Sequence, residues 1–508
     1  MATSNQTLAK NTMFLYIGTL ANLLISLYTS RVVLNTLGVV DYGIYSIVGS
    51  VISMVTIINL LMINATSRFL SIEIGRNDAK RLADTFSSAM IGQIFLALIV
   101  VVLLETIGIY MLNNKLVIPS DRIFAAHTVF QLSIISMFIT TTQQPYNAAI
   151  TAREHFGVYT VIDILNTTLK LIVVFLLVIG DFDKLILYAI LLLAVTIIIT
   201  LTYRIYCIIH FPECRIKWHV EKDILISMLK YSSWTMLGST LKTYSIQGSN
   251  LILNMFFGPV LNAANGIAMT VEGSIMGFSY NAITAFRFQI VKAYAANELK
   301  RMCELIYNAS RYSTALFLLV TIPVFLECNY VLKLWLGQVP EYTLVFVRLL
   351  LMGSIARMNV SLVGISIGAT PNVRNLNILN SILYFSQLPI VYILFKEGAT
   401  PSYLYIVGIF IQFLALFTDM CILRRLIADF SARLYIYSAF LKNIPLLVIS
   451  SCCLFYIQTV MDEGFLRLSL ICVTNVVLFG SYFYAVVLNK EQRQAVIEKI
   501  KNKIKNHE

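Results

Sequence analysis

The stretch Ser30–Ser50, SRVVLNTLGVVDYGIYSIVGS, decides how the rest of the chain is interpreted. Arg31 stands at the end of one long apolar run, and a second apolar run starts near Tyr42. A turn with two glycines and one acidic residue, Asp41, lies between the runs. About 20 apolar residues cross the hydrocarbon core as a helix. The stretch therefore predicts two membrane helices joined by a tight, acidic turn.

A looser copy of this pattern occurs at Leu251–Val271, LILNMFFGPVLNAANGIAMTV. Both copies have an aliphatic pair before Leu-Asn, then a glycine at a bend, then Gly-Ile at the start of the next apolar run. We interpret the repetition as two homologous halves that face each other.

The composition places the whole chain in the membrane. Of 508 residues, 58% are hydrophobic and 13% are charged, whereas a soluble domain is nearer half apolar and a quarter charged. In hydrocarbon, only a helix satisfies its own backbone within one segment, so the fold class predicted is an all-α polytopic membrane protein. The fourteen expected spans are 12–34, 42–64, 86–110, 123–145, 158–180, 185–207, 232–256, 264–287, 305–327, 342–366, 374–395, 402–423, 437–459 and 466–488.

Lysine and arginine predict the orientation of these spans. With the N-terminus inside, 26 of them fall on the cytoplasmic side and seven on the other side. By the positive-inside rule, both termini are expected in the cytoplasm. The net charge of +12 is then explained by cytoplasmic loops that meet anionic lipid, and nucleic acid is not expected as a partner.

The loops predict the domain organisation. Spans one to six form an N-terminal lobe over 1–210, and spans seven to twelve form a C-terminal lobe over 232–425. Between them, 211–231 is a cytoplasmic linker, in which Cys214–Lys230 is charged and amphipathic and is expected to lie along the membrane surface. Residues 426–508 add spans thirteen and fourteen and a basic cytoplasmic tail.

Ionisable residues inside the spans are the candidate functional residues, because such groups usually face a partner or a wet cavity. Lys242 and Glu272 lie near the middle of spans seven and eight. They form either a buried pair or a cation exposed to a cavity, with the acid as its partner or as a proton site. Arg31 either faces the cavity or extends to the outer interface. The other ionisable residues placed within spans are Lys170, Arg311, Arg348, Arg357, Glu105, Asp163 and Asp419.

Sequence signatures of catalysis are missing. The chain has no G-x-x-x-x-G-K-[ST] phosphate-binding loop, and its histidines and cysteines show no metal-ligand spacing. The eight cysteines are expected to be free thiols. We therefore expect no cofactor, no metal and no enzymatic activity.

Two neighbouring segments carry a family resemblance. SLYTSRVVLNTLGVVDYGIYSIVGSV, followed by ATSRFLSIEIGRND at Ala65–Asp78, resembles the Wzx-type O-antigen flippases. That polysaccharide transporter family belongs to the MOP superfamily, with MurJ and the MATE exporters. The resemblance implies two six-helix lobes in a V around a cavity lined by spans one, two, seven and eight, plus two extra C-terminal helices. It also implies a protein of the bacterial inner membrane.

The implied function is to flip undecaprenyl-pyrophosphate-linked oligosaccharide units from the cytoplasmic to the periplasmic leaflet by alternating access. H⁺ or Na⁺ coupling and contact with other polysaccharide assembly proteins are also implied. Cationic residues would hold the pyrophosphate through charge-assisted hydrogen bonds. The cationic set by position is Arg31, Lys242, Arg287, Lys170 and Arg357; the candidates for ion coupling or charge pairing are Glu272, Asp41 and Asp163.

Two alternatives remain open. A MATE-like exporter of small cations would need acidic cavity residues without basic ones, which Lys242 and Arg31 oppose. A polysaccharide polymerase or membrane glycosyltransferase would be expected to carry a large outer loop, and no long polar connection lies on that side.

Overall fold

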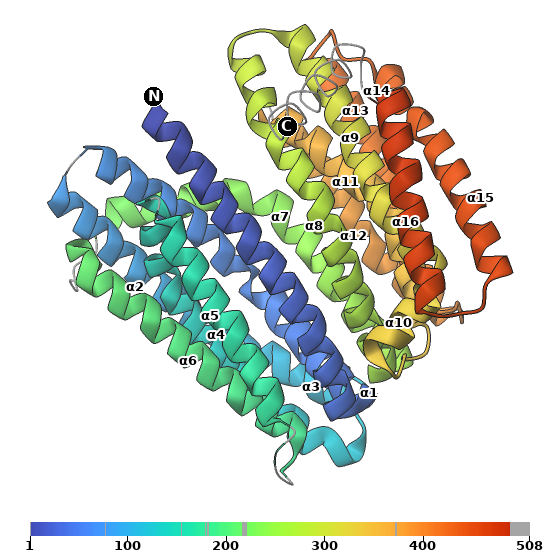
Figure 1. Ribbon diagram of the computed structural model, residues 1–508. Helices are drawn as coiled ribbons and strands as arrows, with labels where there is room; N and C mark the ends of the chain where they lie inside the picture. Colours follow the sequence, from blue (N-terminus) through green and yellow to red (C-terminus); the bar gives the residue numbers. More distant parts are fainter. Residues whose placement is uncertain are drawn as a thin grey trace, which may run out of the picture. The chain divides into compact units, whose positions relative to one another are not determined.

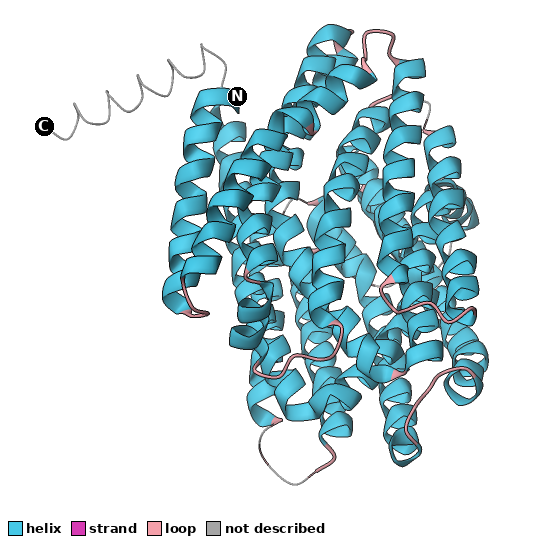
Figure 2. Cartoon of the chain, turned by 90° about the vertical axis from the view of Figure 1, so that its right-hand side faces the viewer, coloured by secondary structure: helices cyan, strands magenta, loops and turns pink. Residues whose placement is uncertain are grey.

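The computed structural model describes residues 2–487 except 77, 154, 178, 180–181, 216–220 and 371–372, and within some helices it describes the backbone only. All regular structure in these residues is helical, and Figure 2 shows helices joined by short loops. The prediction of an all-α fold is confirmed. The basic tail expected after span fourteen lies outside the described residues.

The helices follow the predicted spans closely. The first helices are α1 (Ala2–Arg76), α2 (Ala79–Leu103), α3 (Ile109–Asn114), α4 (Ile123–Ala152), α5 (Phe156–Leu176), α6 (Lys184–His210) and α7 (Lys222–Phe257). They are followed by α8 (Pro259–Ala295), α9 (Leu299–Leu326), α10 (Cys328–Leu336), α11 (Thr343–Gly368), α12 (Arg374–Lys396), α13 (Tyr403–Leu426), α14 (Ala432–Ala439), α15 (Ile444–Val460) and α16 (Phe465–Tyr482).

Eleven helices in the described part are long and apolar enough to cross a membrane. The first of these, Tyr28–Thr56, contains a bend at Gly38 and so includes parts of two predicted spans. Two further predicted spans lie in α7 and α8, which have 36 and 37 residues. This accounts for the fourteen spans expected from hydropathy.

The chain divides into two compact units. The first holds residues up to Ile267 together with Trp335–Thr343 and Tyr384–Leu404, and the second holds the remainder. In the first unit, α1, α4 and α6 surround an apolar core that includes Phe86 and Phe130. In the second unit, α9 packs against α15 and α16 through residues such as Leu318 and Leu454, and Figure 1 shows α15 and α16 in red.

Two glycines break the helices at equivalent places of the repeated sequence. Gly38, inside α1, has φ 79° and ψ 169°, and Gly258, between α7 and α8, has φ 78° and ψ −175°. This backbone conformation is essentially restricted to glycine, because a Cβ atom strains it. Figure 1 shows the chain of α1 turning sharply at its lower end. The repeated Leu-Asn and glycine pattern therefore encodes the same kind of helix break twice.

The two repeated stretches also contact each other within the first unit. A Cβ atom on Gly43 would lie 2.0 Å from the carbonyl oxygen of Pro259, so only glycine fits there. Next to this contact, Asn262 donates hydrogen bonds to Asn250 and accepts one from Asn254 at 2.7 Å. These buried amides satisfy one another, as polar groups in an apolar surrounding must.

The expected surface segment Cys214–Lys230 is not one separate helix. Pro212–Cys214 forms a single 3₁₀ turn, and from Lys222 onward the residues already belong to α7. No proline interrupts the sequence between Lys222 and the middle of span seven. The charged residues therefore extend the membrane helix beyond the apolar region.

Candidate functional site

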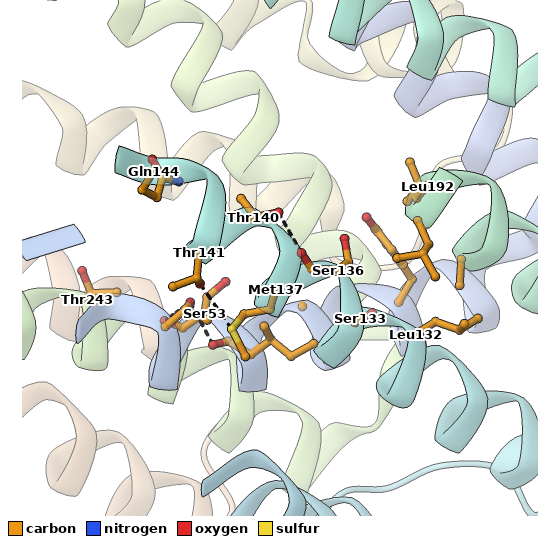
Figure 3. A pocket seen from close by; sticks show the side chains of 16 residues that line it. Ser53, Leu132, Ser133, Ser136, Met137, Thr140, Thr141, Gln144, Leu192 and Thr243 are labelled. Carbon is orange, nitrogen blue, oxygen red and sulfur yellow. Dashed lines mark hydrogen bonds between the residues drawn. The ribbon is translucent and has the colours of Figure 1, made fainter. Parts of the chain in front are cut away.

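A pocket of about 510 Å³ lies in the first unit, between the second half of α1, α4 and α6, with one residue of α7. Figure 3 shows side chains from these helices around one space. The serine and threonine residues that line it are Ser53, Thr56, Ser133, Ser136, Thr140, Thr141 and Thr243. Tyr45 and Gln144 add a phenol and an amide. The volume falls within the range of small-molecule sites.

Several of these hydroxyl groups already donate their proton within their own helix. Thr56 donates to the carbonyl oxygen of Ile52 at 3.0 Å, and Thr140 donates to that of Ser136 at 2.8 Å. Each oxygen keeps its lone pairs as acceptors. Gln144 supplies both donors and an acceptor. The lining therefore offers neutral hydrogen-bonding groups to whatever occupies the pocket.

Among the described side chains, the pocket lining carries no formal charge. None of its sixteen residues is Asp, Glu, Lys, Arg or His. The other lining residues are mainly aliphatic, such as Ile52, Leu132 and Leu192. This mixture of hydroxyl and aliphatic surface matches a neutral, hydroxyl-rich ligand better than an ion, because an ion would lose its hydration without gaining a counter-charge.

The sequence analysis missed this pocket, although a signal for it is present. Span four contains five consecutive polar residues, Thr140-Thr141-Thr142-Gln143-Gln144, which form its longest polar run. Three of the five line the pocket. Thr142 and Gln143 instead point into the protein, where Gln143 accepts a hydrogen bond from Thr200 and Thr142 accepts one from Arg204.

The residues predicted to bind substrate in the first unit lie elsewhere. Arg31 on α1 and Lys170 on α5 are exposed side chains, and neither lines the pocket. Asp163 lies seven residues before Lys170 on the same face of α5, where its carboxylate acts electrostatically on the lysine. The side chain of Lys242, on α7, lies outside the described residues.

Asp41 is a charge partner within the turn after Gly38. Arg122, directly before α4, donates from Nε to Asp41 at 2.8 Å and from Nη1 to Asp183 at 2.7 Å. Asp183 also accepts from the backbone N–H groups of Leu185 and Ile186, which caps α6. Burial by itself raises the pKa of Asp183. The hydrogen bonds that its carboxylate accepts from Arg122 and from these N–H groups outweigh burial and keep this pKa below the ordinary value of an aspartate. This three-residue cluster, the Arg122 clasp, joins the part of α1 after Gly38 to the starts of α4 and α6.

In the second unit, Glu272 and Arg357 form an ion pair. Arg357 Nη1 lies 2.9 Å from Glu272 Oε1, and the hydroxyl of Ser354 donates to the same oxygen at 2.7 Å. With its amide turned to satisfy both neighbours, Gln412 accepts from Arg357 at 3.0 Å. From the sequence alone, no partner for Arg357 could be predicted. Arg287, on α8, is exposed.

A second buried ion pair fixes α16 to the end of α9. Arg467 donates to Glu327 at 2.7 Å, and the side chains are 9% and 0% exposed. Asn475 on α16 also donates to the carbonyl oxygen of Leu319 at 2.7 Å. In this unit, Arg311 on α9 is 3% exposed and donates a hydrogen bond to the hydroxyl of Tyr312 at 3.2 Å, so its guanidinium lies inside the unit.

Of the eight residues predicted for the site, the structure shows a direct contact between two, Glu272 and Arg357. Of the seven whose side chains are described, none lines the hydroxyl-rich pocket. Among the described residues, no group of three or more His, Cys, Asp or Glu side chains is arranged to hold a metal ion.

Comparisons of the sequence and of the structure give different results. No protein-family model matches the sequence, and no curated protein is similar to it at a significant level. The structure is similar to that of the lipid II flippase MurJ in an inward closed conformation, with a TM-score of 0.72 and 12% identity. That match covers 93% of this chain and 99% of the MurJ chain.

Two other solved structures resemble this chain. An inward-facing MATE-family multidrug resistance transporter of the MOP superfamily has a TM-score of 0.65 and 13% identity, over 81% of this chain and 94% of that one. A MOP-superfamily transporter from Pyrococcus furiosus has a TM-score of 0.59 and 13% identity, over 83% and 95%. The chain thus has the fold shared by these transporters and flippases.

Proposed function

We propose that this protein is a flippase for undecaprenyl-pyrophosphate-linked oligosaccharide units in the bacterial inner membrane. The lobes 1–210 and 232–425 would alternate access between leaflets, with both termini in the cytoplasm and coupling to H⁺ or Na⁺. The observation that carries this proposal is the uncharged, hydroxyl-lined pocket of the first unit. A sugar presents neutral hydroxyl groups that both donate and accept hydrogen bonds. These groups match the donors and acceptors of the pocket lining.

The comparison with MurJ supports a flippase over a drug exporter. The MurJ match covers 93% of this chain, whereas the MATE matches cover 81–85%. A larger part of the chain, therefore, has a counterpart in a lipid II flippase. An exporter of small cations would need acidic groups around its ligand, and the pocket has none among its lining residues.

The pyrophosphate requires a different set of residues. Arg31, Lys170 and Arg287 are exposed cations on α1, α5 and α8, and we assign the pyrophosphate to them together with Lys242. Arg357 is a weaker candidate, because its guanidinium is already engaged by Glu272. For the same reason, Glu272 serves better as a charge partner than as an ion-coupling residue.

The pocket is tested by removing one hydroxyl group and one amide while nearly keeping the size of each side chain. In cells that depend on this protein, Thr141→Val combined with Gln144→Leu should reduce surface glycan at least tenfold, since two hydrogen-bonding groups are lost. Lipid-linked oligosaccharide should accumulate on the cytoplasmic leaflet. The matched control is Thr106→Val, which changes an exposed threonine of the same kind outside the pocket.

Equal glycan export by the pocket variant and the control, at equal protein amounts, would remove the pocket from the substrate path. Accumulation of single units on the outer leaflet in cells lacking the protein would instead indicate polymerisation. An unchanged lipid-linked pool, together with lost resistance to cationic drugs, would indicate the exporter.

A further inference from the structure

A second cavity, of about 570 Å³, lies in the second unit where α12 begins and α13 ends. Its lining comes from the first two turns of α12 and the last turns of α13. It shares no residue with the hydroxyl-rich pocket. The ends of two membrane helices place this cavity at the boundary between hydrocarbon and water.

The polar part of the cavity is strongly basic. Arg374 and Asn375 come from α12, and Arg425 comes from α13. Within the described part of the chain, no carboxylate lies within ion-pair distance of either arginine. Two guanidinium groups that line one cavity concentrate positive charge there, and an anion between them would neutralise it. Guanidinium groups bind phosphate oxygens in a bidentate manner, which makes a phosphate group the best match.

The remaining part of the cavity is aliphatic. Ile378 and Leu379 of α12 and Ile422 and Leu426 of α13 form this wall. Ile378 and Leu379 are 40% and 41% exposed. A phosphate dissolved in water would leave this wall uncovered, whereas the first methylene groups of an acyl chain would cover it. The cavity therefore has the polarity of an amphiphile, with charge at one end and hydrocarbon at the other.

We propose that this cavity binds the phosphate headgroup of an anionic phospholipid, with its acyl chains against the aliphatic wall. Basic pockets between membrane helices on the cytoplasmic side are suited to such lipids, and α13 ends on the side that carries most of the lysine and arginine. The proposal is independent of the transported substrate, because none of the residues assigned to transport lines this cavity.

The test measures lipid binding to the purified full chain. Phosphatidylglycerol is added to the protein in neutral detergent, and bound lipid is counted by mass spectrometry of the intact complex. Arg374→Gln and Arg425→Gln should each weaken binding about fivefold, and the double variant about 25-fold, given the usual contribution of one basic residue. Phosphatidylcholine should bind equally to all variants.

Arg424→Gln is the matched control, because it removes the same charge from the adjacent position of α13 without changing the lining. An equal loss of binding in this control would overturn the proposal in favour of a diffuse charge effect. Leu379→Ser should weaken phosphatidylglycerol binding while leaving any binding of inorganic pyrophosphate unchanged. If pyrophosphate displaced the lipid and Leu379→Ser had no effect, the cavity would be a site for soluble phosphates and the lipid assignment would be wrong.

Discussion

The pocket of the first unit and the ion pairs of the second hold their polar groups in opposite ways. In the first unit, seven serine and threonine residues line an open, uncharged pocket. In the second unit, Glu272 with Arg357 and Glu327 with Arg467 neutralise each other in buried pairs. Neutral hydroxyl groups cost little free energy in a membrane helix, so they can remain available to a ligand. Buried charges cost much more free energy unless they are paired. The contrast indicates ligand binding at the pocket and structural cohesion at the ion pairs.

The largest expected effect is on the Glu327–Arg467 pair. Arg467→Met leaves Glu327, which is fully buried, without a cation, so the free energy of unfolding should fall by about 3–5 kcal/mol. Thermal unfolding in detergent measures this loss. The double variant Arg467→Met with Glu327→Gln should recover most of it. A single variant as stable as the wild type would contradict a structural role.

The next effect is expected at the repeated helix breaks. Gly38→Ala and Gly258→Ala should each lower the free energy of unfolding by about 1–3 kcal/mol, because alanine strains the backbone at positive φ. A Cβ atom on Gly38 would meet no atom within 4 Å. A loss of stability in Gly38→Ala would therefore come from backbone strain alone. Gly364→Ala, in a helix with equally open space, should instead be neutral or stabilising.

Glu272→Gln is expected to cost about 1–2 kcal/mol of stability, since the charge-assisted bond from Arg357 becomes a neutral one. If Glu272 is a charge partner, the pH profile of glycan export should keep its shape in this variant. A flattened profile at equal protein amounts would assign Glu272 to proton coupling and would break the contrast between the units.

The Arg122 clasp should give a smaller, pH-dependent effect. The lowered pKa of Asp183 means that its ionised form stabilises the folded protein. The contribution is therefore fully present above the ordinary value of 3.8 and is lost as the pH falls through the folded pKa. Asp183→Asn should lower stability by about 0.5–1 kcal/mol at pH 7, and the difference from the wild type should vanish in acid. A difference that persists in acid would indicate another cause.

The smallest change in stability is expected in the pocket. Thr141→Val combined with Gln144→Leu should alter the free energy of unfolding by less than about 0.5 kcal/mol, although it should impair export. Chemical unfolding of the purified protein provides the measurement. A large loss would show that these side chains support the fold, and the contrast between the units would lose its basis.

The sequence predicted the helices well, because about 20 apolar residues in succession have few alternatives in a membrane. The repeated glycine pattern likewise predicted both helix breaks, since Gly38 and Gly258 each stand after Leu-Asn. Ion pairs between residues far apart in the sequence were harder to predict than the helices. Glu272 and Arg357 are 85 positions apart, and hydropathy carries no information about which charges meet.

The pocket was missed for a different physical reason. Threonine in a membrane helix can donate to a carbonyl oxygen one turn earlier, as Thr140 does, so it fits into a span without a charged partner. Attention to charge alone therefore passed over the run of polar residues at Thr140–Gln144. An uninterrupted polar run inside a span therefore indicates a candidate ligand site, just as a single charge does.

The uncharged lining of the pocket has an electrical consequence. A membrane potential does about 2.3 kcal/mol of work on each elementary charge per 100 mV. Because the sixteen lining residues hold no formal charge, the voltage exerts no net force on them as they change their exposure. A neutral group held there would also cross without electrical work. Voltage sensitivity would then arise from charges other than these sixteen residues.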